Sequence, residues 1–99
     1  MSRIVLAPEI AEDFDRILDH LLAKEAEDPR ARIRAIVRGI DVLADNPLIG
    51  RPTSGVSREL IIGRGNQGYI ALYSYDEILD IVFVTAIRSQ REAGYRSDS

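Results

Sequence analysis

Two amphipathic helical segments, one directly after the other, constrain the fold of this chain more than any other feature. From residue 8 to 22 and again from 29 to 43, large apolar side chains recur every three or four residues, the spacing of one helix face. Only a few polar residues separate the segments, which predicts an antiparallel helix hairpin with a shared apolar face. The first stripe comprises Ile10, Phe14, Ile17, Leu18, Leu21 and Leu22, and the second Ile33, Ile36, Val37, Ile40 and Leu43.

Local signals mark where these helices begin and end. Pro8 suits the first turn of a helix, and Glu9 complements the positive end of the helix dipole. Asp28 followed by Pro29 repeats the signal, a capping side chain before proline at the first helical position. Asp45-Asn46-Pro47 ends the second helix.

Strands surround the hairpin in sequence. A short apolar run precedes it, and after a glycine- and proline-containing linker three further apolar runs follow, the last two separated by a predicted tight turn at Asp76-Glu77. We therefore expect a single α+β domain over residues 1–99, a two-layer β-α-α-β-β-β fold with the helix hairpin on one face of a small, mainly antiparallel sheet and the other face partly open. The expected strands are 3–6, 59–62, 69–75 and 78–87, and the linker is 47–57.

Composition excludes several classes of protein. The 99 residues contain no cysteine and one histidine, His20, which removes disulfides, cysteine-ligated zinc and any site of several histidines. We expect neither a metal nor a cofactor. No apolar run approaches ~18 residues, and the N-terminal run meets Glu9 too early for a secretory signal, so we expect no membrane association and a cytoplasmic location.

Charge is unevenly distributed along the chain. The formal net charge is −3, but residues 1–28 carry three cations against eight acidic residues (−5) and residues 29–64 carry seven arginines against three acidic residues (+4). Twelve of the thirteen cations are arginines, which favour bidentate or stacked contacts with carboxylates, phosphates or aromatic rings. The acidic total argues against a protein that mainly grips phosphate backbones.

Three local features admit more than one interpretation. Gly63–Gly68 has the letters of a dinucleotide fingerprint, but a strand rather than a helix follows it, so we interpret it as a hairpin loop with Arg64 at its tip. His20 lies between Arg16 and Lys24 on the charged side of its helix and is expected to be solvated. Tyr69, Tyr73 and Tyr75 share one side of a strand, either in the core or on an open face for a partner.

The order of these elements resembles the RelE/ParE toxin superfamily over nearly the whole chain. The segments that carry the resemblance are 47–52 (Pro-Leu-Ile-Gly-Arg-Pro), 58–60 (Arg-Glu-Leu), 69–73 (Tyr-Ile-Ala-Leu-Tyr) and 87–96, which includes Arg-Glu-Ala-Gly-Tyr. The resemblance implies a toxin of a type II toxin–antitoxin pair, bound and neutralised by a cognate antitoxin that wraps it in a hetero-oligomer.

Two branches of that superfamily differ in mechanism. RelE-like members cut messenger RNA on the ribosome with lysines, arginines and a C-terminal tyrosine, whereas ParE-like members inhibit DNA gyrase. Here only Arg91 and Tyr95 match the nuclease chemistry, Lys24 is the sole lysine, and Ser89 stands where RelE-like chains tend to be basic. The resemblance therefore favours a ParE-like gyrase inhibitor without catalytic residues, with a RelE-like endoribonuclease using Arg91 and Tyr95 as the alternative and a toxin-fold module without toxicity as a third.

Partner contacts can be assigned to two groups of residues. We expect the end of the last strand to contact the target through Arg88, Arg91 and Tyr95. An antitoxin segment rich in acidic and aliphatic residues, helix or strand, is expected against the sheet edge and the arginines of residues 30–64. The expected antitoxin-binding residues are Arg30, Arg34, Arg38, Arg58, Arg64 and Tyr73.

Overall fold

The computed structural model of the chain describes residues 1–90, and it confirms the predicted order of helices and strands with one additional strand and two short 3₁₀ turns. The additional strand has two residues and lies within the predicted linker, where Pro52 stands at the border of the sheet. The elements are β1 (Arg3–Leu6), α1 (Glu9–Ala23), α2 (Pro29–Asp41), η1 (Val42–Ala44), β2 (Arg51–Pro52), β3 (Arg58–Ile62), η2 (Gly65–Gln67), β4 (Tyr69–Asp76) and β5 (Ile81–Ser89).

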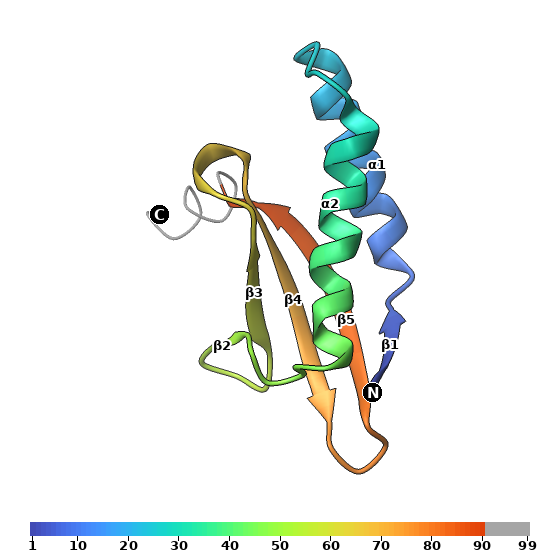
Figure 1. Ribbon diagram of the computed structural model, residues 1–99, viewed down its shortest axis with the longest axis vertical. Helices are drawn as coiled ribbons and strands as arrows, with labels where there is room; N and C mark the ends of the chain where they lie inside the picture. Colours follow the sequence, from blue (N-terminus) through green and yellow to red (C-terminus); the bar gives the residue numbers. More distant parts are fainter. Residues whose placement is uncertain (91–99) are drawn as a thin grey trace.

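The five strands form one sheet in the order β1-β5-β4-β3-β2. β1 pairs with β5 in parallel, and the other three pairings are antiparallel, so the expectation of a mainly antiparallel sheet is confirmed. Figure 1 shows α1 and α2 lying side by side along one side of the sheet, with the turn between them beyond the ends of the strands. Neither helix has the length and apolar character of a bilayer-spanning segment within the described residues.

The core lies between the two helices and the inner face of the sheet. Both apolar stripes contribute to it, and the sheet contributes alternate residues of β4 and three residues of β5, Val82, Val84 and Ile87. Burial of each large aliphatic side chain stabilises the fold by about 1.5 to 3 kcal/mol. The cluster comprises Ile10, Ile17, Leu21, Ile36, Ile40, Leu43, Tyr69, Ala71, Tyr73, Val82, Val84 and Ile87. Of the two interpretations of the tyrosine strand, core packing is therefore confirmed for Tyr69 and Tyr73.

The turn between β4 and β5 differs from the prediction. A tight turn at Asp76-Glu77 was expected, but β4 continues to Asp76 and the last strand runs from Ile81 to Ser89 rather than from 78 to 87. The Asp76 carboxylate accepts hydrogen bonds from the backbone N–H groups of Ile78 and Leu79, both at 3.0 Å. These two apolar residues therefore lie in the turn and are exposed. The prediction placed Ile78 and Leu79 in the last strand because they are as hydrophobic as strand residues.

A β-bulge interrupts the pairing of β4 with β5. Leu72 pairs with Ala86 but the next residue, Tyr73, pairs with Val84, so Thr85 is an extra residue with no partner opposite. The extra residue reverses the alternation of β5, because side chains beyond a bulge face the opposite way from an uninterrupted strand. Arg88 consequently lies on the sheet face away from the helices.

Candidate functional site

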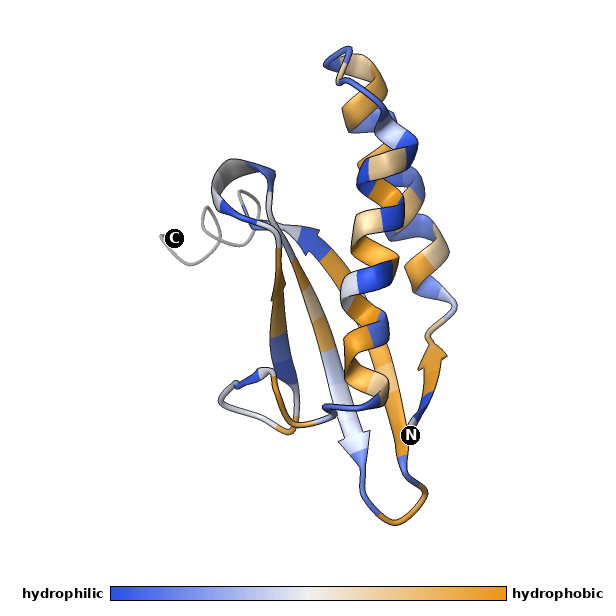
Figure 2. Cartoon of the chain, in the orientation of Figure 1, coloured by the Kyte–Doolittle hydropathy of each residue, from blue (hydrophilic) through white to orange (hydrophobic). Residues whose placement is uncertain are grey.

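Three arginines form an exposed stripe along α2. Asp28 caps the helix by accepting a hydrogen bond from the backbone N–H of Ala31 at 3.1 Å, and the buried side chains of Ile36 and Ile40 fix which face meets the core. The alternation of polar and apolar residues along α2 is visible in Figure 2. The stripe comprises Arg30, Arg34 and Arg38, one residue every four, all exposed.

The charge of this stripe is not compensated within the chain. None of the three guanidinium groups forms a hydrogen bond or ion pair with any residue in the range 1–90. Like charges four residues apart destabilise a helix by about 0.2 to 0.5 kcal/mol per pair. Val42 lies four residues after Arg38 and is also exposed. Beyond η1, the apolar residues Leu48 and Ile49 have roughly half of their surface exposed. This surface is therefore suited to carboxylates at one end and aliphatic side chains at the other.

Tyr73 lies in the core and is not available to a partner. Its side chain is 0% exposed, and its hydroxyl accepts a hydrogen bond from the backbone N–H of Gly50 at 2.8 Å. A Cβ at Gly50 would lie 2.6 Å from the Tyr73 ring, so only glycine fits at this approach. The expectation that Tyr73 contacts the antitoxin is wrong, because β4 turns this residue toward the helices.

Arg58 also serves the fold. It is half-buried, and its Nη1 donates hydrogen bonds to the carbonyl oxygens of Gly50 at 2.8 Å and Leu48 at 3.2 Å. With the Tyr73 hydroxyl, it holds the segment between η1 and β2 against the sheet. These contacts take up donors that a partner would otherwise bind.

Arg64 lies exposed in the connection between β3 and β4. Gly63 there has a φ of 82°, a left-handed conformation that glycine adopts without strain. Only the short turn η2 follows before β4 begins at Tyr69, so no helix N-terminus is presented to a pyrophosphate. The interpretation of Gly63–Gly68 as a hairpin loop is confirmed.

The end of β5 brings Arg88 to the sheet face that the helices leave uncovered. Arg88 pairs with Ile70, whose neighbours Tyr69 and Ala71 face the core, so both Ile70 and Arg88 lie on the opposite face. The other two expected target-binding residues, Arg91 and Tyr95, lie outside the described residues. The structure thus places one member of that group.

One edge of the sheet is open. β2 pairs with β3 only at Arg58 and Glu59, and within residues 1–90 no strand continues alongside Leu60–Ile62. Ile61 in this stretch is 46% exposed. An unpaired apolar edge of this kind accepts an added strand.

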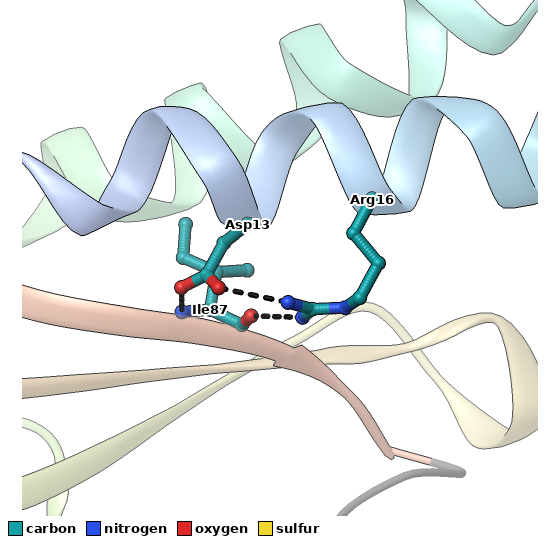
Figure 3. A network of polar contacts seen from close by, with 3 residues as sticks. All are labelled: Asp13, Arg16 and Ile87. Atoms are coloured by element: carbon teal, nitrogen blue, oxygen red, sulfur yellow. Dashed lines mark hydrogen bonds and ion pairs between the residues drawn. The ribbon is translucent and has the colours of Figure 1, made fainter.

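α1 bonds to β5 through two polar side chains that lie beside its apolar stripe. The Asp13 carboxylate accepts the backbone N–H of Ile87 at 2.9 Å, and Arg16 Nη2 donates to the Ile87 carbonyl oxygen at 3.0 Å. Asp13 and Arg16 also form an ion pair at 2.8 Å (Figure 3). The sequence feature that could have indicated this network is the pair of opposite charges, Asp13 and Arg16, three residues apart beside the apolar stripe. We call this network the Asp13–Arg16 clamp.

A second polar network fixes the turn between β4 and β5. Asp80 Oδ1 accepts hydrogen bonds from Ser2 Oγ and from the Tyr75 hydroxyl, both at 2.6 Å. The hydrogen bond from Ser2, followed by that from Tyr75, lowers the pKa of Asp80 below its usual 3.8. The same bond to Asp80 raises the pKa of Tyr75.

No cluster that could hold a metal ion occurs in the described part of the chain. His20, the only histidine of the sequence, is exposed on α1, as expected from its position. The described surface instead presents three features: a cationic stripe on α2, an open edge on β3 and an arginine at the end of β5.

Comparisons with known proteins agree with this geometry. Residues 4–94 match the family described as the ParE toxin of the type II toxin–antitoxin system parDE. The structure resembles a chain of the chromosomal ParDE system from P. aeruginosa with a TM-score of 0.72 at 22% identity, covering 90% of this chain and 96% of the other. It resembles a chain of the RelBE2 toxin–antitoxin complex from Mycobacterium tuberculosis with a TM-score of 0.63 at 18% identity, covering 89% and 96%. No curated protein matches the sequence.

Proposed function

Because this chain belongs to the ParE toxin family of type II toxin–antitoxin systems, we propose that it arrests growth by inhibiting DNA gyrase and is neutralised by a cognate antitoxin. The observation that carries the proposal is the family match over residues 4–94, which includes the end of β5. The sequence resembles the ParE-like branch, whose members inhibit gyrase. Because gyrase acts on the chromosome, we place the toxin in the cytoplasm, and stabilisation of a plasmid is a role such a toxin can serve.

The chemistry of the uncovered sheet face supports binding over RNA cleavage. Within residues 1–90 the cations of this face are Arg3, Arg51 and Arg88. A guanidinium stays protonated in proteins, so it cannot move a proton as a general base. Two carboxylates lie on this face within residues 1–90. Glu59 is paired with Arg51 at 3.3 Å, and Asp76 accepts the backbone N–H groups of Ile78 and Leu79. These groups can bind and orient an anionic surface, whereas ribose cleavage also needs proton transfer.

The target-binding surface in this proposal begins at Arg88 and includes Arg91 and Tyr95. Arginine and tyrosine are the residue types that dominate the binding energy of protein interfaces. Substitution of Arg88 by alanine is therefore expected to weaken gyrase inhibition without disturbing the core, which contains none of its side chain.

The antitoxin surface in this proposal is the arginine stripe of α2 together with the open edge of β3. A helix with carboxylates every four residues would match the spacing of Arg30, Arg34 and Arg38. A following extended segment would pair with Leu60–Ile62, and Arg64 lies at the far end of that edge. Occupation of both surfaces requires a wrapping antitoxin and yields a toxin–antitoxin hetero-oligomer.

The experiment that tests the target is a supercoiling assay with purified gyrase, run beside a translation assay with primer extension on messenger RNA. The proposal expects loss of supercoiling and intact messenger RNA. Cleaved messenger RNA that disappears in Tyr95→Phe would instead establish the endoribonuclease alternative. Induction without antitoxin that leaves growth unchanged would establish the third hypothesis, a toxin fold without toxicity.

A further inference from the structure

The Asp13–Arg16 clamp bonds to the edge of β5 at a position that β1 is too short to reach. β1 accompanies β5 only as far as Val84, whose carbonyl oxygen accepts the backbone N–H of Ala7 at 2.9 Å. Three residues further along, the N–H and the C=O of Ile87 bond instead to the carboxylate and the guanidinium of the clamp. α1 thus supplies with two side chains the acceptor and the donor that a continuing strand would supply with its backbone (Figure 3).

The residue held by the clamp is the first core residue after the bulge. Val82 and Val84 face the helices before the bulge, and Ile87 faces them after it, each 0% exposed. If Thr85 instead took a regular place in the ladder, unbroken alternation from Val84 would turn position 88 toward the helices. Whether Arg88 reaches the uncovered face therefore depends on the register of β5 at Ile87.

We propose that Asp13 and Arg16 are positioning residues for the target-binding end of β5. By bonding both polar groups of Ile87, they hold the register after the bulge and so direct Arg88 to the uncovered face. The inference rests on the proposed function in one respect, that Arg88 contacts the target. Neither clamp residue touches the target itself.

The geometry of the clamp suits this role. Each Asp13 oxygen has one partner, the Ile87 N–H at 2.9 Å and Arg16 at 2.8 Å, and all three contacts involve a charged group, the stronger class of hydrogen bond. The Asp13 side chain is only 15% exposed, so water competes poorly for it. Loss of Asp13 would leave the N–H of a buried residue unpaired, which favours a slipped register.

The test compares clamp variants with a matched control on the same helix. Asp13→Ala removes the acceptor, whereas Asp13→Asn keeps an oxygen for the Ile87 N–H and loses only the ion pair. Asp15→Ala is the control, because the Asp15 side chain is exposed and forms no hydrogen bond or ion pair with any described residue. Each full-length variant is assayed for growth arrest after induction, for gyrase inhibition, for antitoxin affinity and for amide exchange at Ile87.

The proposal expects a selective loss in Asp13→Ala. Amide exchange at Ile87 should accelerate about tenfold, and the half-inhibitory concentration against gyrase should rise about tenfold, with antitoxin affinity changed less than about twofold. Asp13→Asn should recover most of the inhibition, and Asp15→Ala should match wild type. Arg16→Ala should resemble Asp13→Ala, because it removes the other half of the clamp.

A core variant separates positioning from stability. Ile36→Val loses packing at a site far in sequence from β5, and assays well below its melting temperature show what lost stability alone does. If Asp13→Ala inhibits no worse than Ile36→Val of similar melting temperature, the positioning role is overturned. A wild-type chain that arrests growth without inhibiting gyrase overturns the proposed target only, and the growth-arrest comparison of the same variants then decides the role of the clamp.

Discussion

The arginines of this toxin divide into those that its own fold uses and those that it leaves uncompensated. Arg58 donates to the carbonyl oxygens of Leu48 and Gly50, and Arg16 to that of Ile87. Arg34 and its neighbours on α2 have no such partner within residues 1–90. Residue type is the same in both regions, so the accessibility of the guanidinium and its bonds to backbone carbonyls distinguish a structural arginine from one suited to a partner.

The largest effect on stability is expected in the region that Arg58 holds. Gly50→Ala would place a Cβ 2.6 Å from the buried ring and hydroxyl of Tyr73, which must shift and lose its bond to the Gly50 N–H. We expect a loss of about 3 kcal/mol in the free energy of unfolding, measured by denaturant titration. Gly55→Ala is the control, since a Cβ there meets nothing within 4 Å. Equal stability of the two variants would contradict the close packing of the linker.

Arg58→Ala tests the fold's use of an arginine directly. Two backbone carbonyl oxygens lose their donor, and we expect a loss of about 2 kcal/mol in the free energy of unfolding. Arg58→Lys should retain one of the two bonds and lose about half as much. If Arg58→Ala keeps its stability but loses antitoxin affinity, Arg58 serves the partner and not the fold.

The α2 stripe should respond in the opposite way. Replacing Arg30, Arg34 and Arg38 together by glutamine removes two like-charge pairs, so stability should rise by about 0.5 kcal/mol while antitoxin affinity falls about 100-fold or more. Calorimetry of the complex and denaturant titration of the free toxin measure the two quantities. Lys24→Gln, an exposed cation at the end of α1, serves as the control. Unchanged antitoxin affinity in the triple variant would show that the stripe serves another purpose.

The smallest effect is a pH dependence at Asp80, an acidic group used by the fold. Its pKa is lowered in the folded state, so its ionised form stabilises the fold above the ordinary pKa of 3.8, and this contribution disappears as pH falls through the folded value. The stability difference between wild type and Asp80→Asn should therefore be present at about pH 7 and shrink as the pH falls below 3.8 toward a lower, acidic pH. A difference that persists at the lower pH would assign the effect of the substitution to packing.

Prediction from the sequence succeeded where a residue's environment follows from its periodicity. The stripes of Ile10 and Ile36 defined both helices and most of their buried faces, because helical spacing is a property of neighbouring residues alone, although Leu22 and Val37 of those stripes are exposed. It failed at the turn between β4 and β5. Ile78 has the hydropathy of a strand residue, but its backbone N–H donates to the Asp76 carboxylate and the residue lies in the turn. It also failed at Tyr73, since strand alternation shows which residues share a face but not which face is covered.

The sequence by itself determined the two helices, the four longer strands, their order and the uneven distribution of charge, because each depends on spacing or composition within a short stretch. Only the tertiary structure decided which arginines donate hydrogen bonds to backbone carbonyl oxygens and which stay exposed. It also decided that the Arg88 side chain lies on the sheet face that the helices leave uncovered. Those outcomes depend on contacts such as Asp13 with Ile87, between residues 74 positions apart, and on one extra residue in β5. No local pattern encodes a hydrogen bond across that separation, because it exists only once the helices have packed on the sheet.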